Sequence, residues 1–120
     1  MKNYILVGFI VTAFFTSCTN DKIPKPASVC DTMTVSYLTM IKPIVDTKCA
    51  ISSCHVSGSN GNGFDFSTYS GLKAEVLNNN LQGRVVEGNP TYMPPSPSPP
   101  LSQEEKQKFD CWIKAGGLQN

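Results

Sequence analysis

The sequence has few of the residues on which many protein functions depend. Its 120 residues include one histidine, one tryptophan and only 16% charged residues. With His55 as the only imidazole, any site that needs two histidines is excluded. The sequence contains no recognisable grouping of acid, base and nucleophile of the kind that catalysis requires. We therefore do not expect an enzyme, and we assign no catalytic residue.

The sequence also lacks an excess of charge of either sign. Ten basic residues face nine acidic ones, a net charge of +1, and removing the first seventeen residues takes away only Lys2 and leaves nine of each. A protein with this balance has no electrostatic attraction for the phosphates of nucleic acid. We expect no nucleic-acid partner.

The apolar run at the N-terminus is too short to span a membrane. It covers twelve residues, Tyr4 to Phe15, against the roughly twenty that a spanning helix needs. With Lys2 in front of it, the run is typical of an export signal over residues 1–17. The run ends in Phe15-Thr16-Ser17-Cys18, which resembles the lipobox of bacterial lipoproteins, so we expect Cys18 to carry a lipid. Ordinary signal cleavage nearby is the alternative, because Phe15 and Thr16 differ from the commonest lipobox residues.

Two thiols and the only imidazole of the sequence lie together in one segment, Cys49-Ala50-Ile51-Ser52-Ser53-Cys54-His55. Haem is attached covalently at C-x-x-C-H, where the cysteines bond the haem vinyl groups and the histidine binds iron. Four residues separate the cysteines here instead of two. The spacing still predicts a site for haem c with thioethers at Cys49 and Cys54 and with His55 as the proximal iron ligand, provided that the intervening small residues loop outward.

The other cysteines can be assigned around this site. Five cysteines in an exported protein leave one without a partner. If the lipid takes Cys18 and haem takes two, Cys30 and Cys111 are left as a candidate disulfide in an oxidising compartment. The alternative is two ordinary disulfides and one free thiol.

The pattern predicts an all-α domain over residues 35–120, held on a tether formed by residues 18–34 that is stiffened by Pro24 and Pro26. Ile41, Ile44, Val45 and Lys48 have helical spacing and lead into the cysteines. A second helix is predicted over residues 68–77, and residues 83–88 are expected to be extended against the core. Ser102 and Glu105 form a capping box for a last helix from Gln103, with its apolar stripe at Phe109, Trp112 and Ile113.

A second iron ligand must come from a methionine, because no other histidine exists. Met93 is the best candidate, since it lies far along the chain from His55, within residues 89–100, of which six are proline. Prolines reduce the freedom of a loop that must present a thioether at a fixed place. The alternative is a methionine packed under a surface loop.

Taken together, the segments IKPIVDTKC, CH, FDFSTYSGL, YMPP and LSQEEKQKFDCWIKAGG resemble the small c-type cytochrome domains of exported bacterial proteins. The resemblance covers about residues 36–117 and implies a few helices around one covalent haem, with Cys49, Cys54, His55 and Met93 in the roles given above. It implies a monohaem electron carrier that exchanges electrons with a redox partner protein and is anchored by its lipid to a bacterial membrane, facing the periplasm or the exterior.

Three alternatives are left open by the sequence. Cys49, Cys54 and His55 with Cys30 or Cys111 are a candidate zinc set. A haem peroxidase or ligand sensor would leave Met93 off the iron. A disulfide-stapled interaction module would carry no cofactor.

Overall fold

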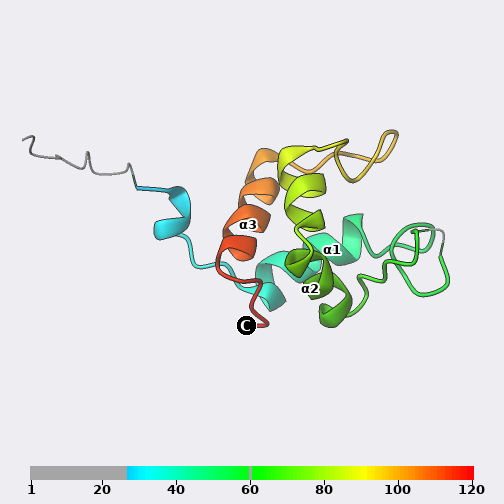
Figure 1. The fold of residues 1–120 in the computed structure, drawn as a ribbon, viewed down its shortest axis with the longest axis horizontal. Helices are drawn as coiled ribbons and strands as arrows, with labels where there is room; N and C mark the ends of the chain where they lie inside the picture. The colour runs from blue at the N-terminus through cyan, green and yellow to red at the C-terminus, as the bar shows by residue number, and fades with distance from the viewer. Residues whose placement is uncertain (1–26, 60) are drawn as a thin grey trace, which may run out of the picture.

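The computed structural model describes residues 27–59 and 61–120. The expected signal peptide, Cys18 and most of the expected tether lie outside these residues. The described chain forms three α-helices, α1 (Lys42–Lys48), α2 (Tyr69–Leu77) and α3 (Gln103–Lys114), and three short helical turns, η1 (Val29–Asp31), η2 (Tyr37–Ile41) and η3 (Gln82–Glu87). No strand occurs in it (Figure 1). The predicted all-α class is therefore confirmed, and none of the described helices is long and apolar enough to cross a membrane.

Helix α1 follows η2 without a break and ends directly before the cysteine segment. Ser36 begins η2, where its hydroxyl accepts a hydrogen bond from the Thr39 amide at 3.3 Å. Pro43 lies in the first turn of α1, where its missing N–H is not needed. Ile44 and Val45 are buried, as their spacing predicted. Cys49 therefore directly follows a helix that is packed against the core.

Helix α3 begins at Gln103, where the sequence predicted it. The Glu105 amide donates to the Ser102 hydroxyl at 3.1 Å, and the Ser102 amide donates back to the Glu105 carboxylate at 2.7 Å. This is the expected capping box, which satisfies two amides that a helix start would otherwise leave unpaired. Phe109 and Trp112 on the predicted stripe are fully buried.

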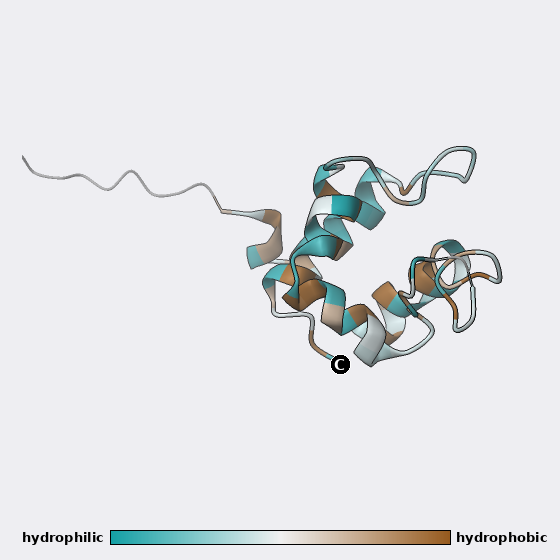
Figure 2. Ribbon diagram, turned by 45° about the vertical axis from the view of Figure 1, so that its right-hand side comes forward, coloured by the Kyte–Doolittle hydropathy of each residue, from teal (hydrophilic) through white to brown (hydrophobic). Residues whose placement is uncertain are grey.

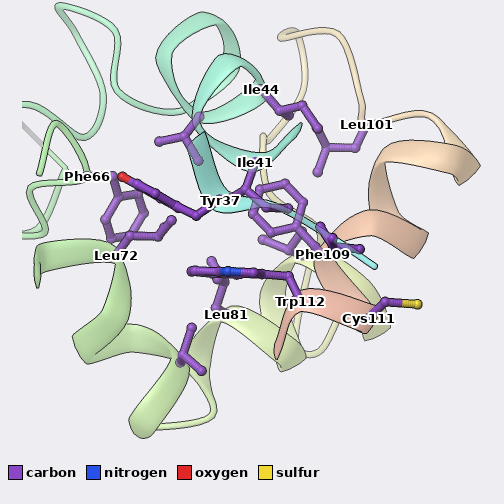
Figure 3. Close-up of a cluster of buried hydrophobic side chains, with 14 residues drawn as sticks. Tyr37, Ile41, Ile44, Phe66, Leu72, Leu81, Leu101, Phe109, Cys111 and Trp112 are labelled. Carbon is purple, nitrogen blue, oxygen red and sulfur yellow. The ribbon is translucent and has the colours of Figure 1, made fainter. Parts of the chain in front are cut away.

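The core forms where α3 meets η2 and α2. The Trp112 ring is stacked on Tyr37 with centroids 5.7 Å apart, and Tyr69 meets Tyr37 edge-on at 5.0 Å. The Trp112 indole N–H donates to the Leu118 carbonyl at 2.8 Å, so its one polar atom is satisfied. Figure 3 shows this cluster, whose buried members are Val35, Tyr37, Ile41, Ile44, Val45, Phe66, Leu72, Val76, Leu81, Val85, Leu101, Phe109, Cys111 and Trp112.

The expectation of an extended segment at residues 83–88 is wrong. These residues belong to the helical turn η3, which ends at Gly88 with φ of 75°. Asn79, with φ of 58°, ends α2, and the Gly83 amide donates to the Asn79 carbonyl at 3.2 Å, so the chain coils again almost at once. The turn packs against α3 and buries Val85. A segment of six residues is too short for its apolar residues to show a helical period in the sequence.

A disulfide joins Cys30 to Cys111, with Cα atoms 5.0 Å apart. The Cys111 sulfur points out of the hydrophobic cluster in Figure 3. The bond holds η1 against α3. The packed part of the chain consequently reaches back to Ser28, into the segment that the sequence assigned to the tether.

Breaking this disulfide should destabilise the domain. It closes a loop with a sequence separation of 81, for which the loss of unfolded-state entropy predicts about 4.5 kcal/mol. We expect Cys30→Ala to lower the free energy of unfolding in urea by roughly that amount, and dithiothreitol to lower the wild-type value equally. The variant itself should be insensitive to dithiothreitol. An unchanged urea midpoint in Cys30→Ala would contradict the structural role of the bond.

Candidate functional site

One cavity of about 560 Å³ is lined by all four residues that the sequence assigned to the haem site, Cys49, Cys54, His55 and Met93. The volume lies within the range of about 300–1,000 Å³ typical of pockets for organic ligands. The cysteine loop (residues 49–55) and the proline-rich loop (residues 89–100) both extend from the same side of the helices (Figures 1 and 2). The fold therefore brings Met93 to the same cavity as three residues from a distant segment.

The widened cysteine spacing is accommodated by a closed loop. The amides of Cys49 and Ala50 both donate to the Val45 carbonyl, at 2.9 and 2.7 Å, and end α1. The His55 amide then donates to the Cys49 carbonyl at 3.0 Å. Ile51 and Ser52 lie exposed and do not line the cavity, whereas Ala50 packs against the core and Ser53 lines the cavity. Only part of the segment between the cysteines is therefore looped outward, and the hydrogen bond from the His55 amide to the Cys49 carbonyl closes the loop.

The His55 ring is held by packing. It is stacked on Phe66 at 4.4 Å between centroids and 27° between planes, and the Phe66 amide donates to the His55 carbonyl at 2.9 Å. A Cβ at Gly61 would lie 2.9 Å from His55 Nδ1 and 2.3 Å from the Cys54 carbonyl oxygen, so only glycine fits there. Nδ1 is buried and has no hydrogen-bond partner among the described residues. Nε2 is therefore the ring nitrogen accessible to a group in the cavity.

Met93 is fixed to the opposite wall through its backbone. Its amide donates to the Arg84 carbonyl at 2.8 Å, and the Asn89 amide donates to the Gly83 carbonyl at 2.9 Å. These two bonds fasten the start of the proline-rich loop to η3. As predicted, residues 89–100 contain neither helix nor strand. The half-buried Met93 and the following Pro94 both line the cavity.

Three charged residues line the cavity that sequence reasoning did not assign to it. Glu75 is 7% exposed and accepts a hydrogen bond from the Asn80 side-chain amide at 2.7 Å. Lys48 pairs with Glu105 at 2.7 Å. Arg84 makes no ion pair within the described chain. Of the three, only Glu75 could have been identified from the sequence. It lies three residues after Leu72 on the buried stripe of α2, where a charged residue is unexpected.

Cys49 and Cys54 are both free thiols. Burial, with smaller contributions from the neighbouring Cys54 and from Glu105, raises the pKa of the Cys49 thiol to about 11, against an opposing effect of Lys48. Cys49 is therefore protonated at neutral pH. The thiolate, which is the form of cysteine that reacts fastest with alkylating reagents, is consequently scarce in the folded haem-free chain.

The zinc set considered above is not assembled. The one cluster of three or more potential metal ligands within residues 27–59 and 61–120 is Cys30, Asp110 and Cys111, and its two sulfurs are joined to each other. Neither cysteine is thus available as a fourth ligand beside Cys49, Cys54 and His55.

Comparisons with models of protein families, with curated proteins and with solved structures find no match. The interpretation of the cavity accordingly rests on the residues that line it.

The raised pKa predicts slow alkylation of Cys49. In the haem-free Cys54→Ser variant, whose other described cysteines are in the disulfide, burial of Cys49 remains, and burial is the largest cause of the shift of its pKa from 9.0 to about 11. Iodoacetamide should therefore modify native Cys49 at pH 8 up to about a hundredfold more slowly than the urea-unfolded chain. The native rate should keep rising up to about pH 11. Stability should fall as the pH rises from 9.0 to about 11, since the unfolded thiol ionises first. Equal native and unfolded rates at pH 8 would contradict the burial of this thiol.

Proposed function

We propose that this chain is a c-type cytochrome that binds one haem covalently and carries electrons on the extracytoplasmic side of a bacterial membrane. The observation that supports this most is the shared cavity, because two free thiols, the only histidine and a loop methionine all line it. These are the side chains that a haem with His/Met ligation requires. The small cytochrome c-like fold is part of the same proposal.

The residues around the cavity fit a flat apolar macrocycle. Phe64 and Phe66 line it on the histidine side, and Leu81 and Val85 line it from the region of η3. Cys49 and Cys54 would hold the group through thioether bonds, and His55 Nε2 and the Met93 sulfur would bind its iron. When bound, haem supplies an iron that passes between ferrous and ferric states. The chain would hold this iron in place, exclude water from it and set its potential through ligation and burial.

The charges of the cavity also suit haem better than a bare metal ion. Haem carries two carboxylates, and Arg84 offers a cation without an acidic partner in the described chain. A zinc ion would instead need Cys30 or Cys111 as its fourth ligand, and these two cysteines are joined to each other. Haem attachment also leaves Cys30 and Cys111 free to form the observed disulfide.

The cellular context extends the proposal beyond the described residues. An export signal over residues 1–17 and a lipid at Cys18 would place the domain at a membrane surface, with its electrons passing to or from a redox partner protein. The disulfide is consistent with an oxidising compartment.

Covalent haem is tested by expressing the exported chain with a haem-maturation system and recording the reduced pyridine haemochrome spectrum after denaturation. We expect haem retained by the wild type and lost on denaturation from a variant with both Cys49→Ala and Cys54→Ala, because thioethers hold it. Each single variant should retain haem through the other cysteine. A colourless wild type, with or without zinc, would overturn the proposal.

Met93→Leu should change axial ligation and leave attachment intact. In the ferric protein we expect loss of the long-wavelength charge-transfer band of sulfur-ligated iron and a lower midpoint potential, because thioether ligation favours the ferrous form. The matched control is Met40→Leu, a half-buried methionine that packs on the core and does not line the cavity. If the spectrum and potential of Met93→Leu equal those of the wild type, Met93 is not the ligand and the open-site alternative gains support.

A further inference from the structure

Tyr92, the residue before Met93, is held between two elements outside the cavity. Its ring lies under the Lys106 ammonium group, which is 3.6 Å from the ring centroid. The ring also lies against Gly88, where an added Cβ would be only 2.5 Å from Tyr92 ring atoms. The side chain is 47% exposed, so these contacts, not burial in the core, fix its position.

Lys106 differs from the other lysines of α3. Lys108 pairs with Glu104 at 2.7 Å and Lys114 pairs with Asp110 at 2.6 Å, each with the acid four residues earlier. At the equivalent place before Lys106 stands Ser102, and Lys106 makes no ion pair in the described part of the chain. Its charge is directed at the face of the Tyr92 ring, where a cation is attracted by the π electrons.

Gly88 provides the space for the ring. Its φ of 75° is in the left-handed region, and it ends η3 directly before the loop. The Asn89 amide returns to η3 at the Gly83 carbonyl, and the Met93 amide returns at the Arg84 carbonyl. Backbone bonds therefore fasten the segment from Asn89 to Met93 at both ends, and the Tyr92 ring fastens it to α3 through Lys106.

We infer that Tyr92, clamped between Gly88 and Lys106, sets the position of the Met93 sulfur in the cavity, so that Gly88 and Lys106 are positioning residues for this ligand. None of the three lines the cavity itself. The inference rests on the proposed function, because it gives these residues a role toward the haem iron. According to this inference, a residue near the start of α3, Lys106, helps to set the position of the Met93 sulfur.

Loosening the clamp should favour a state in which Met93 leaves the iron. An external ligand such as imidazole binds only that state, so its apparent affinity rises in proportion to the open population. A cation over an exposed aromatic ring is weak enough that its loss should raise this affinity about two- to fivefold. The coordination of His55 and the haem attachment should stay unchanged.

The test is an imidazole titration of the ferric holoprotein, followed by the loss of the thioether charge-transfer band. Lys106→Met should raise the apparent affinity about two- to fivefold, and Tyr92→Ala should raise it further because it removes both contacts. Tyr92→Phe keeps the ring and should match the wild type. Lys108→Met is the matched control, since it also removes a positive charge from α3 and leaves Tyr92 in place.

Gly88→Ala tests the other side of the clamp. The added Cβ must displace the Tyr92 ring, so the affinity for imidazole should rise more than in Lys106→Met. Gly116→Ala is its control, because Gly116 also has a left-handed backbone, with φ of 89°, and no atom within 4 Å of an added Cβ. It imposes a similar backbone strain without touching the loop. Thermal unfolding of each holoprotein checks that the variants are folded.

The outcomes separate this inference from the proposed function. Raised imidazole affinity in Lys106→Met and Gly88→Ala, with both controls at the wild-type value, supports the clamp. Wild-type affinity in folded Lys106→Met and Tyr92→Ala overturns it and leaves the cytochrome proposal standing. Equal rises in Lys106→Met and Lys108→Met also overturn it, because the effect would then be one of net charge. A wild type without covalent haem overturns both.

Discussion

The stacking of Trp112 on Tyr37 is the contact on which the rest of the structure depends. It joins the last helix to the turn that leads into α1, and Tyr69 at the start of α2 meets the same Tyr37 ring. Three elements from the beginning, middle and end of the domain are thus fixed relative to one another at one point. The cysteine loop follows α1, which continues η2, and the proline-rich loop follows η3, which packs on α3. If this contact were lost, the two halves of the candidate site would no longer face each other.

A site built on loops must offset a large entropy cost, because each ordered loop residue loses about 1–2 kcal/mol of conformational freedom. The described chain meets part of this cost with local contacts, such as the stack of His55 on Phe66 and the return of the His55 amide to Cys49. The disulfide reduces it further by restricting the unfolded chain. A covalently bound macrocycle would contribute in the same way, since its faces would cover the apolar walls of the cavity and its thioethers would close the cysteine loop. The proposed cofactor is accordingly also a structural element.

The sequence predicted those parts of the fold whose signals are local. The capping box at Ser102 and Glu105, the stripe at Phe109 and Trp112, and the helix before Cys49 all depend on spacings within one or two turns. It also predicted four residues that line one cavity, and it selected Met93 from the prolines around it before the family resemblance gave the same role. It did not predict η3, because that turn forms through contacts with α3 and not through its own periodicity. Nor could it pair Tyr92 with Lys106, since the loop between them carries no signal of where the chain returns.

The two halves of the candidate site differ in how firmly they are held. Cys49, Cys54 and His55 belong to one short closed loop at the end of α1, which the Lys48 and Glu105 ion pair also ties to the start of α3. Burial opposes the charged form of Glu105, but its hydrogen bonds with Lys48 and Ser102 prevail and lower its pKa, so this tie persists at neutral pH. Met93 is held by one backbone bond and by its neighbour Tyr92, which is half exposed. Changes on the surface of α3 should therefore reach the methionine side more readily than the histidine side. On the proposed function, this asymmetry would let the chain adjust the distal ligand, and with it the potential of the iron, without disturbing the attachment of the haem.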